Sequence, residues 1–181
     1  MNSSRHTMPE LSQLIALFYA QPEKLGQFEE VSAEKTPPPF RQLLAHNEHM
    51  TVTVEKFHGC NVDVKVLETR NAGNFYSRKI LLTRQRDGKV VQYGIVRLNC
   101  DYLDDEPANE IKSERIPLGR VLIQHNVLRE VQLTSLWHVQ PAAELRELMG
   151  LQPQETVYGR TALIYCNGEP AVELLEIVTR D

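Results

Sequence analysis

Residues 75 to 100, FYSRKILLTRQRDGKVVQYGIVRLNC, contain two apolar runs separated by Asp87-Gly88. An Asp-Gly pair between runs rich in Ile, Val, Leu and Tyr is typical of a β-hairpin, because both central positions of the favoured two-residue turn need positive φ. The stretch therefore predicts one long antiparallel hairpin, from which the rest of a sheet can be built.

The register of this hairpin follows by counting outward from Asp87 and Gly88 as the loop. The expected facing pairs are Leu82 with Tyr93, Ile80 with Ile95, and Arg78 with Arg97. One face is then apolar except for two guanidinium groups side by side. Like charges opposite each other destabilise a sheet, and Arg is rarely buried unless it is paired. We therefore expect an anion near them, either a protein carboxylate or a ligand that carries carboxylates.

A second hairpin is predicted over residues 157 to 178, with its turn at Asn167-Gly168. The same counting places Glu173 diagonal to Arg160. We interpret these two residues as a cross-strand ion pair.

Glu176 falls on an otherwise apolar face of that hairpin, with no cation on the same face of the hairpin. Two interpretations stay open. Desolvation could raise the pKa of the carboxyl group, which suits a general acid or base. Alternatively, Glu176 pairs with Arg78 or Arg97 across the sheet as a structural bridge.

The composition limits the class of protein. A chain of 181 residues with 41% hydrophobic and 24% charged residues fits one globular domain. A net charge of -4 without a basic cluster argues against nucleic acid and membrane surfaces as partners. No apolar run is long enough to span a membrane, and no apolar signal core is present. Three widely spaced cysteines favour free thiols in the cytoplasm, and no spacing matches a metal site.

The remaining segments complete an α+β pattern. We expect helices at 9–20 (capped by Thr7), 40–46, 116–125 and 141–149, strands at 50–57 and 62–69, an irregular connection at 23–39, an acidic loop at 101–106, and an ambiguous segment at 127–137. Gly119 in the first turn of a helix indicates that something packs close to the backbone there. Residues 1–39 are expected to belong to the same domain as residues 40–181.

Four short motifs occur in one order along the chain: His49-Met50-Thr51, Tyr76-Ser-Arg78-Lys-Ile-Leu-Leu82, Pro117-Leu-Gly-Arg120, and Asn167-Gly-Glu-Pro170 leading to Glu176. Together they resemble the chorismate lyase family, in particular the mycobacterial-type branch of the chorismate lyase and UTRA superfamily. The resemblance covers residues 40 to 181. It implies a single α+β domain, with an antiparallel sheet of about six strands, helices packed on one face, and flaps over a buried site.

The resemblance also implies an activity. A chorismate lyase is a carbon-oxygen lyase of aromatic compound biosynthesis that eliminates pyruvate from chorismate. Its product is 4-hydroxybenzoate, a ubiquinone or phenolic precursor, or a related acid such as 3-hydroxybenzoate. The family needs no metal and no cofactor, so the small dianion chorismate is the one partner expected.

The site residues carry over position by position. The arginine that holds a substrate carboxylate corresponds to Arg78, and the active-site glutamate corresponds to Glu176. Backbone groups that line the pocket correspond to Met50 and Leu118. Two further residues are added: Arg97 from the hairpin register, and Glu173 as a fallback, because Glu176 lies one residue further from the preceding proline than in the best-known bacterial branch.

A non-catalytic alternative remains. Effector-binding domains of GntR-type regulators are similar to chorismate lyase in fold, and such a domain would bind a small aromatic or carboxylate ligand as a sensor. The absence of a preceding helix-turn-helix and the negative charge favour the enzyme. Fold alone does not establish an activity, so the lyase is our main prediction and the sensor its alternative.

Overall fold

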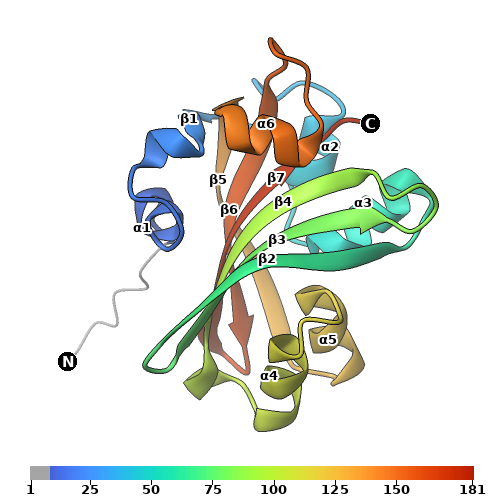
Figure 1. Ribbon diagram of the computed structural model, residues 1–181. Coiled ribbons are helices and arrows are strands. Elements are labelled where there is room, and N and C mark those ends of the chain that lie inside the picture. Colours follow the sequence, from blue (N-terminus) through green and yellow to red (C-terminus); the bar gives the residue numbers. More distant parts are fainter. Residues whose placement is uncertain (1–8) are drawn as a thin grey trace.

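Seven antiparallel strands form a single sheet in the computed structural model, which describes residues 9–181; the expected cap at Thr7 lies outside them. The spatial order is β1-β5-β6-β7-β4-β3-β2 (Figure 1). The strands are β1 (Gly26–Val31), β2 (Val62–Ala72), β3 (Phe75–Arg84), β4 (Val90–Asn99), β5 (Arg129–Pro141), β6 (Val157–Cys166) and β7 (Glu169–Val178). The predicted single-domain α+β fold is confirmed.

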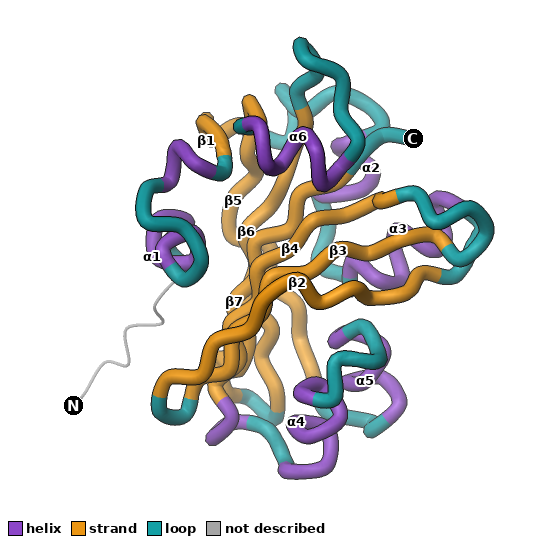
Figure 2. Tube along the Cα trace, viewed as in Figure 1, coloured by secondary structure: helices purple, strands orange, loops and turns teal. Residues whose placement is uncertain are grey.

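Helices pack on both faces of the sheet (Figures 1 and 2). The α-helices of the described residues are α1 (Leu11–Ala16), α2 (Phe40–Leu44), α3 (Met50–His58), α4 (Asp105–Lys112), α5 (Leu118–Gln124) and α6 (Ala143–Met149), with short 3-10 turns at Pro22–Lys24 and Cys100–Tyr102. One core lies between α1, α6 and one face of the central strands. Two others lie on the opposite face, under α2 and α3 and under α4 and α5. No helix of residues 9–181 is both long enough and apolar enough to cross a membrane.

The β3–β4 hairpin forms as predicted, but its register is shifted. The loop is longer than two residues, Gly88 has the positive φ that Asp87 lacks, and the pairing is irregular between Leu82 and Thr83. The observed pairs are Arg78 with Val96, Ile80 with Gly94, and Leu82 with Gln92. A slip of one residue turns every side chain of a strand to the other face. The predicted pairing of Arg78 with Arg97 is therefore wrong, and the two arginines lie on opposite faces.

The β6–β7 hairpin turns at Asn167 and Gly168, both of which have positive φ as the sequence predicted. A bulge after this turn shifts the register, so that Arg160 lies directly opposite Glu176. The predicted ion pair between Arg160 and Glu173 is wrong for this reason.

The segment predicted as a strand at residues 50–57 is helix α3. Its β-branched residues favour a strand, but Met50, Thr51 and Val54 are the buried side chains, and this spacing belongs to a helix. Gly59 ends the helix in the left-handed conformation, at φ 59°.

The other helices predicted after residue 40 are present as α2, α5 and α6. The connection at 23–39 contains the edge strand β1, the acidic loop continues into α4, and the ambiguous segment belongs to β5.

Candidate functional site

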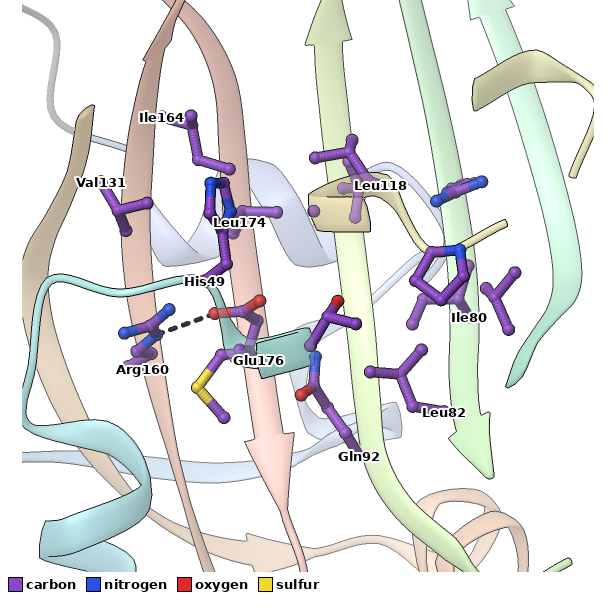
Figure 3. Close-up of a pocket in the computed structure, with 17 residues that line it drawn as sticks. His49, Ile80, Leu82, Gln92, Leu118, Val131, Arg160, Ile164, Leu174 and Glu176 are labelled. Carbon is purple, nitrogen blue, oxygen red and sulfur yellow. Dashed lines mark hydrogen bonds and ion pairs between the residues drawn. The ribbon is translucent and has the colours of Figure 1, made fainter. Parts of the chain in front are cut away.

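A cavity lies between the inner face of strands β3, β4, β6 and β7 and the first residues of α3 and α5 (Figure 3). Its walls are mostly apolar, with a few polar side chains that converge on it. The cavity volume is about 40 Å³, which is room for about three water molecules. A larger ligand needs the walls of the cavity to rearrange.

Arg78 on β3 extends into this cavity and is 1% exposed. Its Nη1 donates a hydrogen bond of 3.1 Å to the carbonyl oxygen of Ile111, while its Nε has no hydrogen-bond partner in the described chain. Burial lowers the pKa of the guanidinium, and the nearby Tyr76 and Glu114 act in the opposite direction. A buried cation that no described carboxylate pairs with is costly, so the surroundings of Arg78 favour an incoming anion.

Arg160 on β6 is the second buried guanidinium that lines the cavity, and all of its nitrogen atoms are hydrogen-bonded. Nε donates to Glu176 Oε2 at 2.8 Å, the ion pair drawn as a dashed line in Figure 3. Nη1 and Nη2 donate to the carbonyl oxygens of His46 and Glu48, each at 2.9 Å. Arg160 therefore fixes the segment before α3 and neutralises Glu176. Glu176 is thus in an ion pair, as the bridge interpretation expected, but its partner is not Arg78 or Arg97: it is Arg160, which the sequence analysis had paired with Glu173.

His49 immediately precedes α3 and lines the cavity (Figure 3). Its Nε2 accepts a hydrogen bond of 2.9 Å from Arg129 Nε. Burial, followed by the charges of Arg129 and Arg160, lowers the pKa of the imidazole to about 4. The ring is therefore neutral at pH 7, and its proton resides on Nδ1.

Gly119 allows α5 to approach α3 closely. A Cβ atom at this position would lie 3.2 Å from Thr51 Oγ1 and 3.3 Å from both Cβ and Nδ1 of His49. The close packing expected at Gly119 is present, and it brings the two helix starts together over the cavity.

The cavity contains four of the six residues predicted for the site: Arg78, Glu176, Met50 and Leu118. Arg97 and Glu173 are not among its lining residues. They pair with each other, with Arg97 Nη2 2.8 Å from Glu173 Oε1. Arg97 lies outside the cavity because the β3–β4 register is shifted by one residue, and Glu173 lies outside it because side chains three residues apart on a strand, as Glu173 and Glu176 are, face opposite sides of the sheet.

Four polar residues of the cavity were missed: His49 as a side-chain contributor, Thr51, Gln92 and Arg160. The signal for Gln92 is a single amide within the apolar run VVQYGIV, and the signal for Arg160 is a single charge next to TALIY. Within residues 9–181, no group of three or more His, Cys, Asp or Glu side chains could hold a metal ion. The three cysteines are free.

No family model and no curated protein matches the sequence. Among solved structures, PhnF from Mycobacterium smegmatis matches with a TM-score of 0.56 and 13% identity, over 72% of this chain and 63% of that one. The effector domain of the same protein matches with a TM-score of 0.51 and 12% identity, over 72% and 88%. The C-terminal domain of a histidine utilization repressor from Pseudomonas syringae pv. tomato matches at 0.45 and 10%, over 65% and 91%. The chain thus spans less than two thirds of the full PhnF chain.

The two PhnF matches show that the chain shares its fold with the PhnF effector domain. At 13% and 12% identity, this similarity is one of fold alone.

The prediction of a lyase is contradicted. The finding that overturns it is that the similar structures are PhnF and its effector domain rather than lyases.

Proposed function

We propose that this chain is a non-catalytic ligand-binding domain that holds a small carboxylate in the cavity beside Arg78. The observation that carries the proposal is a guanidinium that is 1% exposed, extends into a hollow, and has a buried Nε without a partner in residues 9–181. For stability alone, an apolar residue of similar volume would be better at this position, because it avoids the cost of a buried, unpaired charge.

A carboxylate is the ligand group that fits this arginine best. Arg presents its N–H groups in a planar fork that matches the two oxygens of a carboxylate. Each hydrogen bond to a charged group contributes about 1.5 to 3 kcal/mol. The free backbone N–H groups in the first turn of α3, at Met50 and Thr51, lie at the same cavity and favour negative charge.

The body of the ligand is expected to be apolar. Ile80 and Leu82 from β3, together with Leu118 from α5, form the walls beside the polar groups (Figure 3). Buried apolar surface of this kind contributes about 25 cal/mol for each Å² removed from water. A small aromatic or aliphatic acid satisfies both the charge and the walls.

The similarity to the PhnF effector domain supports a sensing role, in which ligand binding changes the position of the helices over the cavity. We further propose that the protein works in the cytoplasm, where its three free cysteines stay reduced.

Isothermal titration calorimetry with a panel of small acids (benzoate, 3-hydroxybenzoate, 4-hydroxybenzoate and chorismate) tests the proposal. We expect at least one acid to bind the wild type and to lose tenfold or more in affinity in Arg78→Met. Arg97→Met is the matched control, because Arg97 pairs with Glu173 outside the cavity, and its affinity should equal that of the wild type.

Two results would contradict the proposal. One is equal affinity of Arg78→Met and the wild type for every acid, including no binding by either. The other is release of pyruvate when the wild type is incubated with chorismate.

A further inference from the structure

Gln92 is a second buried polar side chain of the cavity that the fold leaves without a partner. It lies on β4, is 3% exposed, and points toward the hollow (Figure 3). Its Oε1 accepts no hydrogen bond from the described part of the chain. Four buried side-chain atoms in residues 9–181 lack a partner, and two of them, Gln92 Oε1 and Arg78 Nε, belong to residues that line this cavity.

Packing does not explain an amide at this position. Its neighbours Val91 and Tyr93 on β4, and its cross-strand partners Leu82 and Val178, are all buried apolar or aromatic side chains. Buried polar groups in folded proteins almost always have hydrogen-bond partners, and an unpaired one destabilises the fold. A leucine or methionine would fill the same space without that cost.

Gln92 and Arg78 lie toward opposite ends of the cavity floor. Arg78 is paired with Val96 and Gln92 with Leu82, so their positions on the sheet are four residues apart. At about 3.3 Å per residue, this places their backbones about 13 Å apart along the strands. Ile80 lies between them and packs on Gly94, where a Cβ atom would be 3.2 Å from Ile80 Cδ1. Along β3 and β4 the floor is therefore polar at both ends and apolar in the middle, while Glu176, held by Arg160, lies beside the middle row on β7.

We propose that Gln92 is a specificity-determining residue that selects acids carrying a hydroxyl group at the end opposite the carboxylate. This inference rests on the proposed function, in which Arg78 binds the carboxylate. A hydroxyl group both donates and accepts hydrogen bonds, so it can donate to Oε1 or accept from the amide nitrogen of Gln92. An acid without this group leaves the buried amide unpaired and is rejected, as in sites that recognise a substrate hydroxyl.

Calorimetry with matched acids tests the inference. The probes are benzoate, 3-hydroxybenzoate, 4-hydroxybenzoate and 4-methoxybenzoate, with butyrate and 4-hydroxybutyrate as an aliphatic pair. We expect the wild type to bind at least one hydroxy acid tenfold or more tightly than its unsubstituted parent. In Gln92→Leu this preference should disappear, while affinity for the parent acid stays equal or increases.

The control variant is Gln132→Leu, which changes an exposed glutamine of β5 that does not line the cavity. It should keep the preference of the wild type. Gln92→Met provides a second replacement of similar size, and thermal unfolding verifies that each variant is folded.

The outcomes separate the inference from the function on which it rests. One outcome is that the acids bind and Arg78→Met weakens their binding, but the preference for hydroxy acids is absent or is equal in the wild type and Gln92→Leu. This outcome refutes the role of Gln92 and leaves the ligand site standing. If no acid binds the wild type, or if Arg78→Met binds as tightly as the wild type, the ligand site itself is refuted and Gln92 with it.

Discussion

Replacing Arg78 with methionine is expected to stabilise the fold, because this side chain is buried without a carboxylate partner. The substitution removes one hydrogen bond, to the carbonyl oxygen of Ile111, but that oxygen still accepts from Glu114 N at 3.2 Å. It also removes a buried, unpaired Nε, which costs about 1 to 3 kcal/mol. We therefore expect Arg78→Met to raise the free energy of unfolding by about 1 to 3 kcal/mol.

Replacing Arg160 with methionine is expected to have the opposite effect on the free energy of unfolding. Arg160 is 0% exposed and donates to Glu176 and to the carbonyl oxygens of His46 and Glu48. Its removal leaves the Glu176 carboxylate buried without its cation and releases the segment before α3. Breaking one partner of a buried ion pair costs about 3 to 5 kcal/mol. Arg160→Met should lower the free energy of unfolding by about that amount.

Urea denaturation followed by circular dichroism measures both changes, and thermal unfolding provides a second measure. A domain of this size shifts in melting temperature by about 2 to 4 °C per kcal/mol. Arg78→Met should melt above the wild type and Arg160→Met well below it. If Arg78→Met is destabilised as strongly as Arg160→Met, Arg78 is a structural residue and the reasoning that assigns it to a ligand fails.

Three further predictions concern the surroundings of the site. Because the pKa of His49 is lowered from about 6.5 to about 4 in the folded state, the unfolded chain binds more protons between these values, and wild-type stability falls as the pH drops from 6.5 to 4. The loss of stability reaches about 3 kcal/mol. Urea denaturation at pH 7 and pH 4 should show a correspondingly smaller loss for His49→Asn, and an equal loss in the two proteins would contradict the lowered pKa of His49. Gly159→Ala should lower stability by about 1 to 3 kcal/mol, because its Cβ would lie 2.8 Å from the carbonyl oxygen of Glu176. Gly94→Ala should lower it less, because there the nearest atoms belong to the flexible side chain of Ile80. Thermal melts in which Gly94→Ala is the less stable variant would contradict this order. Arg97→Met should lower stability by about 1 kcal/mol without changing acid affinity in calorimetry, since Arg97 and its partner Glu173 both lie outside the cavity. A change in affinity would mean that this ion pair affects ligand binding in the cavity.

The two hairpins could be predicted from the sequence because their signals are local. Asn167-Gly168 forms the expected two-residue turn with positive φ at both positions, and apolar runs on both sides form the strands. The registers could not be predicted, because bulges shift them and depend on packing far from the turn. One such shift moved Arg97 to the other face, and another brought Arg160 opposite Glu176.

Helix α3 shows a different limit. Its residues have β-branched side chains that favour a strand, yet the helix forms because Met50 and Val54 pack into the core on its inner side. Tertiary packing therefore overrides the local preference. The burial of Arg78 in the cavity could be predicted, since an arginine in an apolar strand indicates a special role. Gln92 is also a single polar residue in an apolar run, but it is a weaker signal, because burying an uncharged amide costs less free energy than burying a charge.

The proposed function depends on the binding of a ligand carboxylate by the Arg78 guanidinium. Proton–nitrogen correlation spectra of arginine Nε–H groups test it most directly, with the Arg78 signal assigned by its loss in Arg78→Lys. On titration with the acid that binds most tightly in calorimetry, the Arg78 signal should move in proportion to occupancy, while the signal of Arg160, already bonded to Glu176, should stay in place. An acid that saturates the protein without moving the Arg78 signal would contradict the account.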